Sequence, residues 1–256
     1  MRHEMVTSRA NPLVARLRKL NARRAARREE GAFVGEGPKL LGEALRWQVP
    51  LETVVYATGT QLPHLPPSVR LVEVPDSLLQ AVAQTQTPQG VVFIGQTPTT
   101  DLPRKLTGDR YLILDGVQDP GNVGTIWRTA DAFGADGLIL CQGCADPWGP
   151  KTVRATMGAA FRLPVWETSL EEAAARLREA DIPLYATALR ADTRDVRELS
   201  LGRSGVIIGS EGRGVSQLSL ELCQQTVKIP MLERCESLNA AVAASVVLWE
   251  MARSIL

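Results

Sequence analysis

Three loops in the second half of the sequence carry residue types that could do chemistry, and each follows a strand-like run. The first run ends in a Gly/Pro loop, after which a helix begins near Asn122. Backbone N–H groups at a helix N-terminus attract anions, and Arg128 follows almost two turns later. The structural alternative is that Asn122 only caps the helix and that Arg128 is only solvated. The residues of this loop leave both interpretations open.

The second and third loops offer a close backbone approach and further polar side chains. Over Gly205–Val215, three glycines fall within six residues directly after an apolar run, which lets a ligand approach the backbone. The pattern is not the dinucleotide fingerprint, because Gln217 stands where the third glycine belongs, and no P-loop is present. A ligand-free tight turn would use the same glycines. In the third loop, Ser237 and Asn239 open the last helix, where either could be only an N-cap.

Alternating strand-like and helical stretches predict how these loops are positioned. They indicate an α/β fold with a mostly parallel sheet and helices on both faces. Parallel strands bring their carboxyl ends to one edge, where such folds bind ligands. The expected strands are Tyr111–Asp115, Gly137–Cys141, Leu184–Thr187, Gly205–Gly209 and Thr226–Ile229, and the expected helices are Asn122–Phe133, Leu170–Ala180 and a last helix from about Leu238.

The first hundred residues predict a smaller α/β unit. Asn11 and Pro12 suit the N-cap and the first position of a helix whose leucines recur at helical spacing. Residues 98–108 are rich in Pro and Thr and form the expected linker, so the predicted domains are residues 1–97 and 109–256. Further helices are expected at Pro38–Trp47 and about Ser77–Gln84, with strands at Thr53–Ala57, Val69–Val74 and Val91–Gly95.

The net charge of the chain hides a basic segment. There are 29 Lys and Arg against 28 Asp and Glu, and this balance of +1 alone argues against a nucleic-acid partner. Between Arg9 and Arg28, however, eight basic residues occur with no acidic one, which leaves 21 basic against 28 acidic elsewhere, or −7. Such a run is commonly a solvated helix face, but its charges repel unless a polyanion such as RNA neutralises them. The eight candidates for RNA contact are Arg9, Arg16, Arg18, Lys19, Arg23, Arg24, Arg27 and Arg28.

Length and cysteine content exclude other classes. The longest apolar run, Ala240–Trp249, falls far short of the roughly 20 residues that cross a bilayer, and no apolar core follows the N-terminal charges. Four cysteines do not make a disulfide framework, so a soluble protein of the reducing cytoplasm is expected. Cys141 and Cys144 lack a second ligand pair at zinc spacing, which favours a buried or loop-structural role and no metal.

The three loops together resemble a known family. Asn122-Val-Gly-Thr-Ile-Trp-Arg128, Ile208-Gly-Ser-Glu-Gly-Arg-Gly214 and Ile229-Pro-Met231 followed by Ser237-Leu-Asn239 are similar to the three motifs of the SpoU (TrmH-type) RNA 2′-O-ribose methyltransferases of the SPOUT superfamily. The resemblance covers about residues 109–256 and implies a C-terminal trefoil knot. The N-terminal part, from Ser8 to about Gly95, resembles the small L30e-like substrate-binding domain common in this family.

The resemblance also implies a cofactor, a catalytic set and a partner. S-adenosylmethionine would be bound mainly by backbone groups, and the residues lining or flanking it would be Thr187, Gly209, Glu211, Ile229, Met231 and Leu238. The implied catalytic residues, most of which face the ribose and phosphate, are Asn122, Arg128, Glu211, Ser237 and Asn239. The family's enzymes are usually homodimers joined through the catalytic domain, so the last helix is either core or interface.

Ribose methylation needs in-line attack on the sulfonium methyl and loss of the hydroxyl proton. Both histidines, His3 and His64, lie in the first domain, so an imidazole base is not expected. An arginine pKa lies above about 12, which makes deprotonation of arginine difficult. Our hypothesis is that Arg128 binds the adjacent phosphate and positions or polarises the 2′-hydroxyl, while phosphate or water takes the proton.

The expected function is S-adenosylmethionine-dependent methylation of an RNA ribose, with ribosomal RNA as the favoured substrate. One alternative is a transfer-RNA ribose methyltransferase, because the same catalytic domain serves both substrates. Another is a non-catalytic RNA-binding or ribosome-assembly protein on the same fold, against which the complete catalytic set argues. A nucleotide-binding dehydrogenase is excluded by the missing fingerprint.

Overall fold

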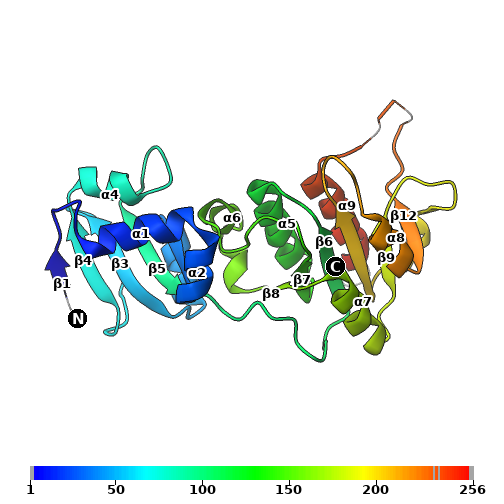
Figure 1. The fold of residues 1–256 in the computed structure, drawn as a ribbon, viewed down its shortest axis with the longest axis horizontal. Coiled ribbons are helices and arrows are strands. Elements are labelled where there is room, and N and C mark those ends of the chain that lie inside the picture. Colours follow the sequence, from blue (N-terminus) through cyan, green and yellow to red (C-terminus); the bar gives the residue numbers. More distant parts are fainter. Residues whose placement is uncertain (1–2, 233, 236, 254–256) are drawn as a thin grey trace. The chain divides into compact units, whose positions relative to one another are not determined.

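A computed structural model describes residues 3–232, 234–235 and 237–253 of the chain (Figure 1). These residues form two compact units. Unit 1 holds the residues up to Pro98 together with Asp146–Phe161, and unit 2 holds Thr99–Ala145 and the residues from Arg162 onward. The domain limits expected from the sequence stay a prediction, and they differ from the units in where Asp146–Phe161 is placed.

Unit 1 is built on a mixed sheet with the strand order β1-β4-β3-β5-β2. Strand β5 runs antiparallel to β3 and β2, while β4 is parallel to β1 and β3. The strands are β1 (His3–Met5), β2 (Ala32–Glu36), β3 (Leu51–Ala57), β4 (Arg70–Val74) and β5 (Val91–Gln96), and the helices are α1 (Pro12–Ala22), α2 (Arg24–Glu30), α3 (Pro38–Arg46), α4 (Asp76–Val82), α6 (Pro150–Ala155) and the short η1 (Ala159–Phe161).

One face of this sheet is covered by α1, α2 and α4. The side chain of Asn11 caps α1 by accepting from the Leu13 N–H at 2.9 Å, and Pro12 takes the first helical position. Leu17 and Leu20 recur on the buried side of α1 and pack against apolar residues of the sheet. The predicted start of this helix is therefore confirmed.

The other face of the unit 1 sheet carries an aromatic cluster around Phe33 of the edge strand β2. The centroid of the Phe33 ring lies 6.1 Å from that of Phe93, 5.0 Å from that of Trp148 and 5.8 Å from that of Phe161. Large aromatic side chains contribute much of the apolar area in a core. The segment Asp146–Phe161 therefore completes the core of unit 1, although it follows the first strands of unit 2 in the sequence.

Unit 2 is a parallel sheet with the strand order β10-β12-β9-β11-β6-β7-β8. The strands are β6 (Arg110–Asp115), β7 (Gly137–Leu140), β8 (Val165–Glu167), β9 (Leu184–Thr187), β10 (Arg194–Asp195), β11 (Ser204–Gly209) and β12 (Gln225–Lys228), and the helices are α5 (Pro120–Ala132), α7 (Leu170–Glu179), α8 (Gln217–Leu222), α9 (Ala240–Ala252) and the short η2 (Val196–Glu198).

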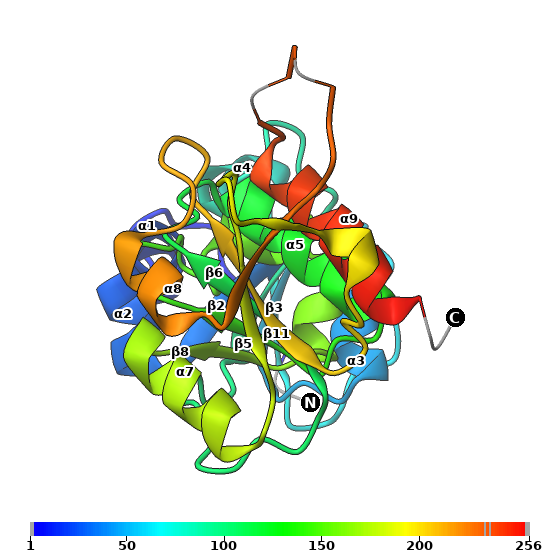
Figure 2. The ribbon, with the colours of Figure 1, turned by 90° about the vertical axis from the view of Figure 1, so that its right-hand side faces the viewer.

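Helices cover both faces of the unit 2 sheet. Helices α5 and α9 lie side by side on one face, and α7 and α8 pack on the other (Figure 2). The predicted α/β fold is confirmed, and each predicted strand is present with ends shifted by at most one or two residues. The trefoil knot stays a prediction. None of the helices in the described part of the chain has the length and apolarity that crossing a bilayer requires.

Candidate active site

The carboxyl ends of four neighbouring strands bring the predicted loops together. Strands β12, β9, β11 and β6 are adjacent and parallel, and the pairs at their ends join Thr187 to Val227 and Gly209 to Asp115. The loops that follow β6, β11 and β12 therefore leave the same edge of the sheet. This is the crevice position that the sequence predicts.

Asn122 lies inside helix α5 and not at its N-cap. The cap is Asp119, whose Oδ1 accepts from the backbone N–H of Asn122 at 2.8 Å, and Pro120 takes the first helical position. The capping interpretation of Asn122 is therefore wrong, because the Asp-Pro pair before it is the stronger start signal. The side chain of Asn122 is left to make other contacts.

Three of the predicted catalytic side chains form a hydrogen-bonded row. Asn122 Nδ2 donates to Glu211 Oε1 at 2.6 Å, and Asn239 Nδ2 donates to Asn122 Oδ1 at 3.2 Å. Asn239 is also the N-cap of α9, and its Oδ1 accepts from the N–H groups of Ala241 at 2.9 Å and Val242 at 3.3 Å. The cap fixes the orientation of the Asn239 amide, which in turn fixes that of Asn122. Asn239 therefore both caps α9 and contacts Asn122.

The loop that carries Glu211 is compact because of two glycines. Ser210 and Gly214 exchange backbone hydrogen bonds of 3.0 and 2.9 Å. A Cβ atom at Gly209 would lie 2.0 Å from the carbonyl carbon of Gly214, and Gly214 itself has a φ of +68°. At Gly212, by contrast, a Cβ atom would meet open space. The shape of the loop therefore requires glycine at 209 and 214 but not at 212.

Arg128 lies farther along α5 with an exposed side chain. In the described part of the chain, its guanidinium forms no ion pair with a carboxylate, and no hydrogen bond joins Arg128 or Ser237 to the row of three. Ser237 is exposed just before α9. An arginine remains charged and binds a phosphate through two parallel N–H···O bonds. The guanidinium of Arg128 is therefore available for such a ligand.

The residues expected to hold the cofactor lie at a strand end and on the segment between β12 and α9. Thr187 Oγ1 donates to the carbonyl of Ile207 at 3.0 Å, which ties the end of β9 to β11. Ile229 and Met231 are half-buried, and Leu238 is 37% exposed. The role of these side chains in binding stays a prediction.

Asp115 also lies at the carboxyl edge of the sheet, although it is not among the site residues predicted from the sequence. Its Oδ2 accepts from the backbone N–H of Ser216 at 2.7 Å and from Ser219 Oγ at 2.6 Å. The signal in the sequence was an acidic residue at the carboxyl end of a buried strand, at the start of the loop that leads to the first motif. The partners of this carboxylate are Ser216, the N-cap of α8, and Ser219 within α8, which lie 101 and 104 residues later and which no local pattern reveals.

The two cysteines near this edge are buried. Burial raises the pKa of both thiols, that of Cys144 to about 11. Cys144 Sγ donates to the carbonyl of Leu114 at 3.2 Å. A protonated, hydrogen-bonded thiol stabilises structure and is a poor nucleophile, so the structural interpretation of Cys141 and Cys144 agrees with their surroundings.

Acidic residues from outside the basic segment neutralise part of it within unit 1. Arg16 pairs with Glu30 at 2.7 Å and with both carboxylate oxygens of Glu52. The hydrogen bonds from Arg16 hold the pKa of both acids below their ordinary values. Lys19 lies 3.4 Å from Glu30. The charge repulsion expected from the sequence is therefore partly relieved by the fold.

Arg27 has a structural role that differs from the RNA contact expected of it. The residue is 6% exposed, and its Nε and Nη2 donate to Asp146 Oδ2 at 2.9 and 2.5 Å. Its Nη1 donates to the carbonyls of Leu20 and Asn21. These bonds tie α2 to the segment Asp146–Phe161. The cations of the basic segment that are exposed are Arg9, Arg18, Lys19, Arg23 and Arg28.

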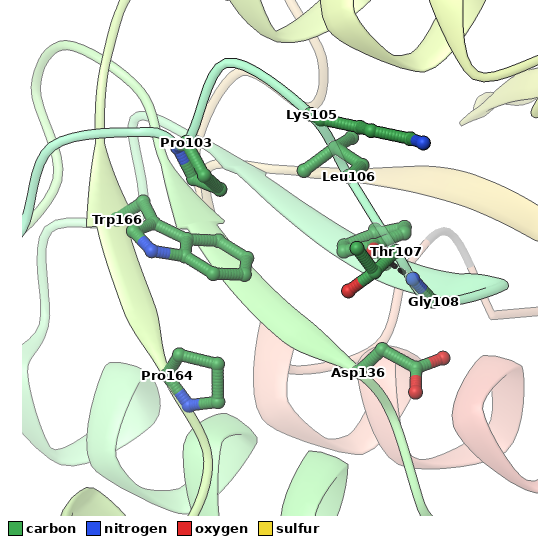
Figure 3. Close-up of a pocket in the computed structure, with 9 residues that line it drawn as sticks. Pro103, Lys105, Leu106, Thr107, Gly108, Asp136, Pro164 and Trp166 are labelled. Carbon is green, nitrogen blue, oxygen red and sulfur yellow. Dashed lines mark hydrogen bonds between the residues drawn. The ribbon is translucent and has the colours of Figure 1, made fainter.

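A cavity of about 200 Å³ lies at the opposite, amino-terminal edge of the unit 2 sheet. Figure 3 shows Trp166 and Asp136 bordering it. Asp136 Oδ2 accepts from the backbone N–H groups of Asp109 and Arg110, each at 2.9 Å, and so holds the start of β6. None of the predicted site residues lines this cavity, so the candidate site is the carboxyl edge.

Comparison with known proteins agrees with the motifs. Residues 109–249 match the SpoU rRNA Methylase family, and residues 11–92 match the MRM3-like substrate binding domain. Among curated proteins, the 23S rRNA (guanosine(2553)-2′-O)-methyltransferase RlmP of Bacillus subtilis is 31% identical over 97% of this chain and 99% of its own length.

Two solved structures extend the similarity to the whole fold. An AdoMet-bound rRNA methyltransferase from Sinorhizobium meliloti superposes with a TM-score of 0.87 at 32% identity and covers 99% of each chain. The SpoU methyltransferase AviRb from Streptomyces viridochromogenes, in complex with the cofactor AdoMet, has a TM-score of 0.86 at 29% identity, over 95% of this chain and 98% of that one. With the family match spanning more than half of its length, this chain belongs to the SpoU rRNA methylase family.

Proposed function

We propose that this protein transfers a methyl group from S-adenosylmethionine to a ribose 2′-hydroxyl of ribosomal RNA. The observation that carries the proposal is the hydrogen-bonded row of Asn122, Glu211 and Asn239, which joins one residue from each of the three motifs. RlmP, a relative along its whole length, is named a 23S rRNA 2′-O-methyltransferase. Two similar solved structures hold AdoMet, which supports the cofactor.

The residues at this edge fit such a cofactor. Small-molecule sites combine apolar walls with a few polar backbone groups. Here the half-buried side chains of Ile229 and Met231 and the partly exposed Leu238 supply apolar surface, and the loop after Gly209 supplies backbone. When bound, S-adenosylmethionine supplies an electrophilic methyl group on a sulfonium that leaves readily.

Arg128 holds the phosphate next to the target ribose through the two-pronged face of its guanidinium. This contact places the 2′-oxygen in line with the methyl carbon, so that the O–C bond forms as the C–S bond breaks. The hydroxyl proton passes to a phosphate oxygen or to water. Arg128 does not take it, because an arginine pKa above about 12 makes a poor base.

The row of Asn122, Glu211 and Asn239 orients the ribose in this proposal. One hydrogen of Asn122 Nδ2 and the oxygen Glu211 Oε2 have no hydrogen-bond partner among the residues that the structure describes. A ribose hydroxyl fits both groups, since it accepts from an amide and donates to a carboxylate. Ser237, two residues before the N-cap of α9, adds a third polar contact in this proposal.

Unit 1 supplies phosphate contacts that do not depend on the nucleotide sequence of the RNA. Exposed cations such as Arg18 of α1 and Arg28 of α2 bind phosphates, and this binding weakens as the salt concentration rises. The match to a substrate binding domain over residues 11–92 supports this role. The compartment in this proposal is the cytoplasm.

The proposal includes a homodimer joined through unit 2. Helix α9 leaves Val242 49% and Trp249 52% exposed, and the ring centroids of Trp249 and Phe133 lie 5.6 Å apart. Large exposed apolar side chains mark association surfaces. Light scattering on the purified protein tests this part, with a dimer mass expected for the wild type and a monomer mass for Trp249→Glu.

The function is tested by incubating the protein with methyl-labelled S-adenosylmethionine and ribosomal RNA from cells that lack it. We expect label on a ribose, seen as a nucleotide that resists alkaline cleavage. Glu211→Gln is expected to lower the rate at least tenfold. The amide replaces one of the two acceptor oxygens of the carboxylate by an NH2 group that can only donate, so it cannot accept from Asn122 and from the ribose hydroxyl at the same time. Glu221→Gln is the matched control, since Glu221 is exposed on α8 and, among the residues that the structure describes, accepts only from the side chain of Gln217, at 3.1 Å.

Two outcomes would replace the proposed function. Transfer to transfer RNA alone would make the protein a tRNA methyltransferase. No transfer to any RNA, together with no binding of S-adenosylmethionine by calorimetry, would leave a non-catalytic RNA-binding protein.

A further inference from the structure

The carboxylate of Asp115 holds the loop that carries Glu211. Asp115 is the last residue of β6 and pairs in the sheet with Gly209, the last residue of β11. The loop leaves β11 at Gly209 and returns at Ser216, whose backbone N–H donates to Asp115 Oδ2 at 2.7 Å. Both ends of the loop are therefore fixed to one residue, at one end by strand pairing and at the other by the carboxylate.

A second bond makes this attachment specific. Ser219 Oγ donates to the same Oδ2 at 2.6 Å, and Ser219 is completely buried. Hydrogen bonds to a charged acceptor are about twice as strong as those between neutral groups. In the described part of the chain Asp115 has no Lys or Arg ion-pair partner, and its hydrogen-bond donors are Ser216 and Ser219. Its carboxylate is thus dedicated to the returning end of the loop.

The residue before Asp115 is itself held in place. The carbonyl of Leu114 accepts from the Cys141 N–H at 2.9 Å and from Cys144 Sγ at 3.2 Å. The end of β6 is therefore held by bonds that a substitution of the Asp115 side chain does not remove. Glu211 lies between the two attached ends of the loop, and its carboxylate reaches Asn122 at 2.6 Å.

We propose that Asp115 is a positioning residue for methyl transfer, which acts by holding the Glu211 carboxylate against Asn122. This inference rests on the proposed function. Asp115 touches neither ribose nor cofactor in this scheme, so its loss lowers the rate of the chemical step and leaves the affinity for RNA almost unchanged. A displacement of about 1 Å at a reacting group can cost about a hundredfold in rate.

The experiment compares Asp115→Asn with Asp136→Asn in the full-length protein. Asp136 is a matched control, because its Oδ2 also accepts two hydrogen bonds, but at the amino edge of the same sheet. We expect Asp115→Asn to lower kcat by about 10- to 100-fold with a KM for RNA within about threefold of wild type. Asp136→Asn should lower the melting temperature and keep kcat within about twofold.

A double variant separates positioning from a general loss of structure. If Asp115 acts through Glu211, then Asp115→Asn combined with Glu211→Gln should be no slower than Glu211→Gln alone, within about twofold. A double variant whose kcat falls by the product of the two single-variant factors would overturn the proposal. So would an Asp115→Asn enzyme with the kcat of an active wild type.

Amide hydrogen exchange gives a readout that needs no activity. Asp115→Asn should speed exchange over residues 209–216 by at least about tenfold, and Asp136→Asn should not. Unchanged protection of this loop in Asp115→Asn would overturn the proposal even if the wild type transferred no methyl group. Absence of methyl transfer by the wild type, with the exchange result as expected, would count against the proposed function alone.

Discussion

Replacing Gly209 by alanine would place a Cβ atom 2.0 Å from the carbonyl carbon of Gly214 and 2.1 Å from the amide nitrogen of Val215. Ordinary contacts of a Cβ atom begin at about 3.4 Å. Because both neighbours are backbone atoms, no side-chain rotation relieves the clash. The loop must therefore move by more than about 1 Å, and Glu211 moves with it.

The magnitude of the effect follows from this displacement. Forcing extra volume into a packed site costs about 1–3 kcal/mol of folding free energy. A misplacement of about 1 Å can lower the rate about a hundredfold, which corresponds to about 2.7 kcal/mol of transition-state stabilisation. We therefore expect Gly209→Ala to lower kcat/KM for methyl transfer about a hundredfold or more and to weaken the binding of S-adenosylmethionine.

The assay combines methyl transfer, calorimetric binding of S-adenosylmethionine and thermal unfolding. Gly212→Ala is the matched control, because it makes the same substitution in the same loop where a Cβ atom would meet nothing within 4 Å. It should remain within about threefold of wild type in kcat/KM. Equal losses in the two variants, or a fully active Gly209→Ala, would refute the steric reasoning.

Arg128→Lys keeps the positive charge but removes the planar fork, so kcat should fall about tenfold or more while the melting temperature stays the same; methyl transfer and thermal unfolding check this, and full activity would remove the fork from the mechanism. Arg27→Ala removes the closer of two arginines from the mostly buried carboxylate of Asp146, which keeps Arg24 at 4.0 Å and the backbone N–H of Trp148 at 3.1 Å. Urea unfolding should therefore show a loss of about 3 kcal/mol, at the low end of the cost of breaking a buried ion pair, whereas a loss below about 1 kcal/mol would contradict the importance of this pair. The pKa of Cys144 is raised from 9.0 to about 11 in the folded protein, so the thiolate forms first in the unfolded chain. The contribution of this thiol to the free energy of unfolding is therefore fully present below pH 9. It falls by roughly 3 kcal/mol as the pH rises from 9 to about 11. Unfolding curves between pH 8 and pH 11 should be flatter for Cys144→Ala, and identical pH dependence in the variant and the wild type would show that this thiol does not contribute.

The meeting of the three loops could be predicted from the sequence, because the fold class determines which strand ends share an edge. Asn122 lies 89 residues from Glu211 and 117 from Asn239, yet each follows or precedes a strand of one parallel sheet. The carboxyl ends of such strands share an edge, so the order of strands and loops predicts that these loops meet, while the choice of residues within them came from the family resemblance. Local signals also predicted the start of α1, because both the N-cap residue Asn11 and the spacing of the leucines after it indicate a helix there.

Interactions that link distant residues with no periodic pattern could not be predicted. The partner of Arg27 is Asp146, 119 residues later, and the partners of Asp115 lie 101 and 104 residues later. Each depends on the final packing of segments that carry no common signal. The basic segment shows the same limit, since its sequence contains none of the acids, such as Glu52, that neutralise it.

The placement of Asp146–Phe161 in unit 1 has a consequence for the order of events during protein synthesis. When the ribosome has made the chain as far as Pro98, Phe33 still lacks the rings of Trp148 and Phe161, and Arg27 still lacks its carboxylate. The first unit therefore completes its core only after β6, α5 and β7 of the second unit have emerged. The two units mature as an interleaved pair, and an exchange of unit 1 between relatives would have to transfer two separate stretches of the gene.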